Sequence, residues 1–283
     1  MTPGGASTTE CVREAREWGP TEHGTGRGKA IVPAHSQGEP GIARTRDGRE
    51  LYYRRLAGPA GAGTVPTVVF EGGLAAGRSY RAPVQAALTE VAPTVVYDRS
   101  GLGRSPAAPA GVPRRLHTLA GDLGGLLDHL GPEGPYVLVG HSWGGPLVRL
   151  AAAARPTRVA GLVLVDPSDE ACDLLFQPSM RRAERVGQLA TVLMARLGLL
   201  GRAYRSLTAA LPPDAAADMR AEGCTVAMTR TRGRELEDAA GDLRALLENP
   251  PGLAGLPEAD HLVLTTSAAE LAEEVRRLVE RGR

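Results

Sequence analysis

Residues 135–154 read PYVLVGHSWGGPLVRLAAAA, and this stretch decides how the rest of the chain is interpreted. An apolar strand pattern at residues 136–139 runs into glycine, and a helical pattern follows at once. Residues 140–144, GHSWG, form a G-x-S-x-G pattern at this strand-to-helix turn. So tight a turn forces Ser142 into a strained backbone conformation, and the flanking glycines remove side chains that would collide. We therefore expect an exposed serine hydroxyl at the carboxyl end of the strand, the alternative being a turn that only packs helix on strand.

The alternation of strand and helix extends on both sides of this stretch. Strand patterns lie at TVPTVVFE, APTVVYD and AGLVLVD, and helical patterns at SYRAPVQAALTE and RRLHTLAGDLGGLLDHLG. Residues 41–55 predict two strands joined by a type I′ hairpin at Asp47-Gly48. Strands alternating with helices are typical of βαβ units. The predicted class is α/β, with a mostly parallel sheet flanked by helices.

The rest of the chain divides into three further segments. Residues 1–40 are rich in Gly, Ser, Thr, Pro and charge and predict a disordered tail, which makes residues 41–170 the first part of the core. Residues 171–250 predict an inserted helical cap, whose apolar residues could line a cleft. Residues 251–283 complete the core with a histidine loop and a final helix. The cap's stripe is Val186, Leu189, Val192, Leu193, Leu197 and Leu200; the final helix has Leu271, Val275, Leu278 and Val279, with a Ser267/Glu270 capping box.

Composition excludes several classes of protein. The 283 residues include 33 Lys+Arg and 32 Asp+Glu, a net charge of +1 that predicts no nucleic-acid partner. The three cysteines (Cys11, Cys172 and Cys224) have neither metal-ligand nor C-x-x-C spacing, so we expect no metal site, no disulfide scaffold and a reducing, cytoplasmic location. Arginines interrupt the longest apolar runs, and the first residues contain no apolar signal segment, so no membrane span is expected.

A serine nucleophile needs a base within hydrogen-bond reach. The candidates reduce to His261 by elimination, because it alone follows the nucleophile, on a loop before the final helix. The alternative is a surface histidine near a turn. The other five histidines are two in the tail (His23, His35), two on one helix (His117, His129) and His141, which we expect to point away from the serine.

An acyl carbonyl that becomes tetrahedral also needs hydrogen-bond donors for its oxyanion. The N–H of Trp143 lies at a helix start, where the dipole favours negative charge. A second N–H is expected in the glycine-rich turn EGGLAAG, at Leu74 or Gly73. The alternative for this turn is an ordinary loop at the end of a strand.

These residues together resemble the α/β-hydrolase fold family, in particular its esterases and lipases. The matching features occur in order from Gly41: the turn Gly72-Gly73-Leu74, the segment YDRSGLGRS at 97–105, GHSWGG, LVLVDP, and DHLV at His261. The resemblance implies a Ser–His–acid triad, no cofactor, a helical cap after Val165, and a structural Asp98 that holds its loop. Branches of the family that act on epoxides or haloalkanes use an aspartate nucleophile, which Ser142 argues against.

The acid of the triad departs from the family pattern. In most members it follows a strand after the cap, but here LENPPGLAGLP runs almost directly into EADHLV, so the chain looks shortened by two strands. TVAMT (225–229) could be a displaced strand. Some members place the acid at the position of Asp166, which we take as the candidate, with Glu170, Asp169 and Asp260 as alternatives. An ordinary turn carboxylate is equally compatible with Asp166.

The sequence therefore predicts a cofactor-independent serine hydrolase that acts on a carboxylic ester or similar small acyl substrate. Ser142 would form an acyl-enzyme, His261 would act as base, and Leu74 and Trp143 would hold the oxyanion. An apolar cap would favour a hydrophobic acyl or alcohol group. One alternative is a catalytically degenerate fold that binds a small molecule or a partner; another is a lyase or perhydrolase with the same triad. Oligomeric state does not follow from the sequence.

Overall fold

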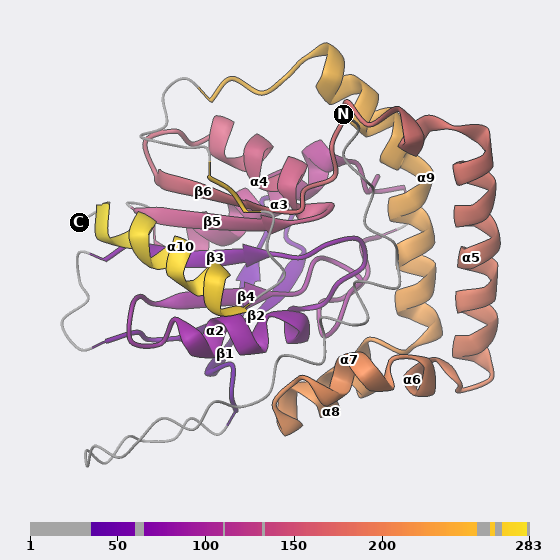
Figure 1. The fold of residues 1–283 in the computed structure, drawn as a ribbon, viewed down its shortest axis with the longest axis horizontal. Coiled ribbons are helices and arrows are strands. Elements are labelled where there is room, and N and C mark those ends of the chain that lie inside the picture. The colour runs from indigo at the N-terminus through magenta and orange to yellow at the C-terminus, as the bar shows by residue number, and fades with distance from the viewer. Residues whose placement is uncertain are drawn as a thin grey trace.

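The computed structural model describes residues 35–59, 65–109, 111–131, 134–253, 261–263 and 268–281. Within these residues, seven strands form one sheet in the order β1-β2-β4-β3-β5-β6-β7 (Figure 1). The strands are β1 (Glu39–Arg44), β2 (Glu50–Leu56), β3 (Thr67–Glu71), β4 (Thr94–Tyr97), β5 (Tyr136–His141), β6 (Val159–Val165) and β7 (His261–Val263). β1 and β2 pair in antiparallel fashion and the five others are parallel, so the predicted mostly parallel sheet is confirmed.

Helices cover both faces of this sheet. α3 (Leu116–Leu130) and α4 (Gly144–Ala153) pack on the face that carries Val69 and Leu138. α2 (Ala82–Ala87) and α10 (Ala268–Arg281) pack on the opposite face, which carries Phe70 and Val137 (Figure 1). Successive residues of a strand point to opposite faces, and both faces are buried here. This is why the strands read as continuous apolar runs rather than alternating ones.

Between β6 and β7 the described chain is helical, as predicted for residues 171–250. We call these residues the helical segment. It contains η2 (Asp173–Phe176), α5 (Pro178–Arg196), α6 (Leu200–Ala203), α7 (Arg205–Ala209), α8 (Pro213–Glu222) and α9 (Val226–Glu248). α5 and α9 lie side by side at one end of the sheet (Figure 1). No helix among the described residues is both long and apolar enough to cross a membrane.

Two features of the helical segment differ from what the sequence suggested. TVAMT is not a strand: Thr225 caps α9, its hydroxyl accepting the N–H of Met228 at 3.1 Å. Most large side chains of the predicted apolar stripe of α5 face solvent, although Leu189 also lines a cavity of about 500 Å³ between α5 and α9. Val186, Leu189, Leu193 and Leu197 are between 57% and 71% exposed, and only Leu200, beyond the end of α5, is buried. Periodicity identified an amphipathic helix but could not show which face is covered.

The β1–β2 hairpin exists, but its turn is not type I′, which needs a positive φ at both central residues. Here Gly48 is at φ +82°, whereas Asp47 is not in the left-handed region. Gly48 N–H donates to Thr45 O, and Thr45 N–H donates to Arg49 O, each at 2.9 Å. The loop is a turn followed by one left-handed glycine, which places three residues between the bonded ends.

The two ends of the chain also depart in part from prediction. The predicted disordered tail, residues 1–40, includes residues that are folded. β1 begins at Glu39, and His35 lies 3.1 Å from a carboxylate oxygen of Asp218 in α8. Residues 1–34 and Ser267 lie outside the described residues. His261 is the first residue of strand β7 rather than part of a loop. The final helix is confirmed as α10, with the predicted stripe buried.

Candidate active site

Ser142 occupies the sharp corner between β5 and α4. Its φ is +50°, in the left-handed region that residues with a side chain rarely adopt. Its N–H donates to Val165 O at 3.0 Å, and its carbonyl accepts the N–H groups of Gly145 at 2.9 Å and Ser168 at 3.0 Å. The predicted strained elbow is confirmed, and these bonds tie it to the turn that follows β6.

The two glycines of the pattern are required by close backbone contacts. A Cβ placed on Gly140 would lie 2.5 Å from the carbonyl oxygen of Gly144. A Cβ on Gly144 would lie 2.7 Å from the carbonyl oxygen of Glu71. Real Cβ atoms do not approach so closely, so both positions need glycine for the reason that the sequence suggested.

The glycine-rich turn after β3 lies against the elbow. A Cβ on Gly73 would be 3.3 Å from the Cβ of Ser142. The N–H groups of Gly73, Leu74 and Trp143 donate to no acceptor within the part of the chain that the structure describes. Trp143 stands immediately before α4, at the positive end of its dipole. These amides are free to receive an oxyanion, while the assignment of Leu74 and Trp143 as the two donors stays a prediction.

A buried ionic network supports this turn, and the sequence did not reveal it. Arg99 Nη1 donates to the carbonyl of Gly72 at 2.9 Å, and Nη2 donates to that of Gly73 at 2.7 Å. Arg99 also pairs with Glu71 at the end of β3 and with Glu235 of α9. Arg99 belongs to the segment YDRSGLGRS, on which the family resemblance rests, so a role near the site could have been predicted from the sequence. Glu235 lies in an ordinary helical pattern, and no signal marked it.

Opposing effects act on the two carboxylates of the network. Burial raises the pKa of Glu235, but the nearby charges of Arg99 and Arg114 more than offset it, so the pKa lies below its ordinary value. Burial dominates at Glu71 and raises its pKa despite the charge of Arg99. Glu235 is therefore the firmly ionised partner of the two arginines.

Asp98 holds the loop that carries this arginine, as the family resemblance implied. Its carboxylate accepts the backbone N–H of Arg78 at 2.9 Å and that of Arg104 at 3.1 Å. The Arg78 guanidinium also donates to it, at 2.5 Å. Because both side chains of this ion pair are completely buried, Asp98 is committed to the loop rather than free to act in catalysis.

The backbone of His261 is placed, but its side chain lies outside the described part. In the sheet its Cα pairs with Val163, whereas His141, next to the serine, pairs with Val165. His261 therefore begins β7 two residues, about 7 Å, before the level at which β5 ends. Contact between Ser142 and the His261 ring stays a prediction.

Asp166 directly follows β6, at φ +41°, and its side chain is exposed. Among the described residues its carboxylate has no hydrogen-bond partner. Glu170 is paired with Arg149 at 2.7 Å, and Asp169 accepts the N–H of Ala171 at 2.8 Å. Asp260 lies outside the described residues. This leaves Asp166 as the uncommitted carboxylate beside the elbow, and its role as triad acid stays a prediction.

His141 contributes a neutral ring to the site. Its Nδ1 would lie 3.1 Å from a Cβ on Gly73 and has no hydrogen-bond partner among the described residues. Burial, together with the charge of Arg81, lowers the pKa of His141 to about 3. The ring is therefore uncharged at neutral pH and adds no cation beside the turn.

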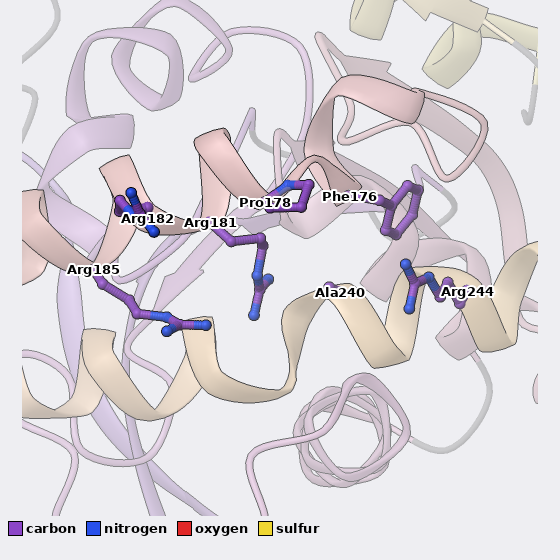
Figure 2. A pocket seen from close by; sticks show the side chains of 7 residues that line it. All are labelled: Phe176, Pro178, Arg181, Arg182, Arg185, Ala240 and Arg244. Carbon is purple, nitrogen blue, oxygen red and sulfur yellow. The ribbon is translucent and has the colours of Figure 1, made fainter.

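A groove between α5 and α9 has a cavity of about 450 Å³. Arg181, Arg182 and Arg185 line it from α5, and Arg244 lines it from α9 (Figure 2). The Arg244 guanidinium lies over the ring of Phe176, 5.0 Å from its centroid. The four arginines give this groove of the helical segment a cationic lining.

Comparison with known proteins agrees with this geometry. A family model described as "alpha/beta hydrolase fold" matches residues 66–196. Lipase LipV of Mycobacterium tuberculosis is 48% identical over 77 residues, which are 27% of this chain and 28% of the lipase. Epoxide hydrolase B of the same organism is 41% identical over 69 residues, which are 24% of this chain and 19% of that protein. The matches thus span less than a third of these relatives.

Among solved structures, an alpha/beta hydrolase from Sphaerobacter thermophilus superposes with a TM-score of 0.53 at 20% identity. The match covers 84% of this chain and 99% of that one. At this identity the likeness concerns the fold alone. The strand order, the elbow at Ser142 and the family model over residues 66–196 lead to one conclusion: the chain has the α/β-hydrolase fold.

Proposed function

We propose that the protein is a serine hydrolase that cleaves a carboxylic ester or similar small acyl compound. The observation that carries the proposal is the position of Ser142, held at φ +50° against a turn whose N–H groups at Gly73 and Leu74 have no acceptor among the described residues. A hydroxyl raised from the sheet beside free amide donors suits attack on a carbonyl whose oxygen becomes negative.

The proposed chemistry has two steps. Ser142 Oγ bonds to the substrate carbonyl carbon while His261 takes its proton, and the N–H groups of Leu74 and Trp143 stabilise the oxyanion. The tetrahedral intermediate collapses, and the alcohol leaves with the proton from His261. Water, deprotonated by the same imidazole, then releases the acid from Ser142. Asp166 would orient the imidazole and stabilise its cation.

The nucleophile favours an ester over an epoxide as substrate. The resemblance to the family implies aspartate as the nucleophile of its epoxide-opening branch, and this chain has serine at that position. The similarity to Epoxide hydrolase B therefore supports the fold without carrying its reaction to this protein.

A fluorophosphonate probe tests the proposal directly. It should label the wild-type protein at Ser142 and fail to label Ser142→Ala. Ser168→Ala is the matched control, because Ser168 lies beside the elbow and its N–H bonds to the carbonyl of Ser142. Labelling should survive in this control. Equal labelling of wild type and Ser142→Ala, or no labelling of the wild type, would refute the proposal that the protein is a serine hydrolase.

The register of His261 favours one second candidate, a degenerate fold that binds a small molecule without turnover. The histidine begins a strand about 7 Å before the level at which β5 ends, rather than following the end of a strand. Hydrolysis of p-nitrophenyl esters that Ser142→Ala abolishes would exclude this candidate. Absence of turnover together with saturable binding of a small ester would favour it.

A further inference from the structure

The turn that carries Gly73 and Leu74 is held from the side of its carbonyl groups. Arg99 donates from two nitrogens, Nη1 to the carbonyl of Gly72 at 2.9 Å and Nη2 to that of Gly73 at 2.7 Å. In a trans peptide the C=O group and the following N–H point in opposite directions. Fixing these two carbonyls on Arg99 therefore directs the N–H groups of Gly73 and Leu74 away from it. The direction of both donors depends on where the guanidinium is held.

Glu235 of α9 holds that guanidinium and the next residue of the turn together. Its Oε1 accepts from Arg99 Nε at 3.0 Å, and its Oε2 accepts from Nη2 at 3.1 Å. The same Oε2 accepts the N–H of Ala75 at 2.8 Å. Ala75 is at φ +53°, which is unfavourable for a residue with a Cβ and so needs support from its surroundings. Glu235 supplies this support.

The network is closed to solvent and contains two basic and two acidic side chains. Arg99 and Arg114 face Glu71 and Glu235, and none of the four is more than 5% exposed. Removing one partner would leave a buried charge uncompensated, so the members act as a unit. One member belongs to α9, which lies 160 residues from Ala75 in the chain. The helical segment is thereby connected to the turn beside the nucleophile.

We propose that Glu235 is a positioning residue for the turn that carries the oxyanion donor Leu74, or Gly73 in its place, acting through Arg99 and through the N–H of Ala75. The proposal rests on the hydrolase function proposed above. It makes α9 a part of the catalytic apparatus, since a shift of this helix against the sheet would redirect both donors.

Glu235→Gln tests the proposal, because the amide keeps the shape of the side chain but presents an NH2 group to the guanidinium or to Ala75. Asp242→Asn is the matched control: Asp242 is a second buried carboxylate of α9 and accepts the N–H of Leu116 at 2.9 Å, on a different helix. With p-nitrophenyl acetate, kcat should fall about 10-fold to 100-fold in Glu235→Gln, with KM within twofold, because oxyanion donors act chiefly in the transition state. Asp242→Asn should keep kcat within twofold. Equal losses of kcat in both variants, or a change confined to KM, would overturn the proposal.

Combining Glu235→Gln with Arg114→Gln removes one buried charge of each sign. This second variant keeps the network balanced if Glu235→Gln alone fails to fold, and it should show the same loss of kcat. Wild-type kcat in the double variant would overturn the proposal.

Amide hydrogen exchange provides a measurement that is independent of activity. Peptides covering residues 71–77 should take up deuterium faster in Glu235→Gln than in wild type, because the N–H of Ala75 loses its charged acceptor and faces either a weaker amide oxygen or an NH2 group. Asp242→Asn should leave these peptides unchanged. No difference at 71–77 would overturn the positioning role even in an active enzyme. Faster exchange at 71–77 in Glu235→Gln, in a protein that has no esterase activity, would support the connection to α9. It would instead refute the proposal that the protein is a serine hydrolase.

Discussion

Ser142 illustrates at the scale of one residue how a local pattern encodes geometry. A serine in the left-handed region is held at a cost of about 1–2 kcal/mol, which the surrounding hydrogen bonds must offset. The elbow supplies three such bonds, from its N–H to Val165 and to its carbonyl from Gly145 and Ser168. The strain is therefore a property of position 142 and not of the hydroxyl.

Replacing Ser142 separates this strain from the chemistry. Ser142→Gly and Ser142→Ala both lack the hydroxyl, but only glycine adopts φ +50° without penalty. We expect Ser142→Gly to be more stable than Ser142→Ala by about 1 kcal/mol. Urea unfolding monitored by circular dichroism measures the difference. Equal stability of the two variants would show that the corner carries no strain.

His141 predicts a pH dependence of stability. Its folded-state pKa of about 3 lies below the ordinary value of 6.5, since burial disfavours the cation. Between these two values the unfolded chain binds a proton that the folded chain does not, so stability falls as the pH drops below about 6.5. From pH 7 to pH 5, His141→Gln should lose about 2 kcal/mol less than wild type in urea unfolding. Parallel losses in the two proteins would contradict this explanation.

At the scale of elements, β5 and α4 meet so closely that glycine is needed in the strand. A Cβ at Gly140 would approach the carbonyl oxygen of Gly144 to 2.5 Å and Val148 Cγ2 to 2.6 Å. The backbone of α4 cannot move away without shifting the elbow. The junction of these two elements is therefore sensitive to a single added methyl group.

Gly140→Ala should destabilise the protein by about 2–3 kcal/mol, as overpacking of a rigid contact does. Gly187 in the middle of α5 is the control, because a Cβ there meets nothing within 4 Å. Gly187→Ala should stabilise by about 0.5–1 kcal/mol through helix propensity. The midpoints of urea unfolding measure both effects. Similar effects of the two substitutions would show that the β5–α4 contact is looser than the structure indicates.

Elements also show where prediction from sequence reaches its limit. The elbow and the turn at Gly72–Gly73 were predictable because a few consecutive residues specify each of them. The contact between Glu235 and Ala75 was not, because a glutamate in a helical pattern carries no information about a partner 160 residues away. For α5, the spacing of apolar residues predicted the helix correctly, but it could not predict that most of its large apolar side chains face solvent.

At the scale of the whole molecule, the two long helices of the helical segment differ in how they are anchored. α9 has seven buried residues, including Glu235, Leu243 and Leu246, whereas α5 has none. Local opening requires little free energy where few apolar contacts are broken. α5 should therefore open more readily than the helix beside it.

Hydrogen exchange should show this difference directly. We expect amides of residues 178–196 to exchange well before those of residues 226–248 in the native protein, under the same conditions. The measurement is mass spectrometry of peptides from each helix. Equal protection would mean that the exposed face of α5 is covered in solution, and a dependence of that protection on protein concentration would identify a second copy as the cover.

The bond from Glu235 to Ala75 has a consequence for synthesis on the ribosome. The nascent polypeptide presents the glycine-rich turn long before the glutamate that holds it is translated. At about 5–20 residues per second, the 160 intervening residues take roughly 8 to 32 s. Throughout this interval Ala75 must tolerate an unfavourable φ unaided or wait in another conformation. The proposed catalytic competence should accordingly arise late in translation, after Ser142 itself has already emerged.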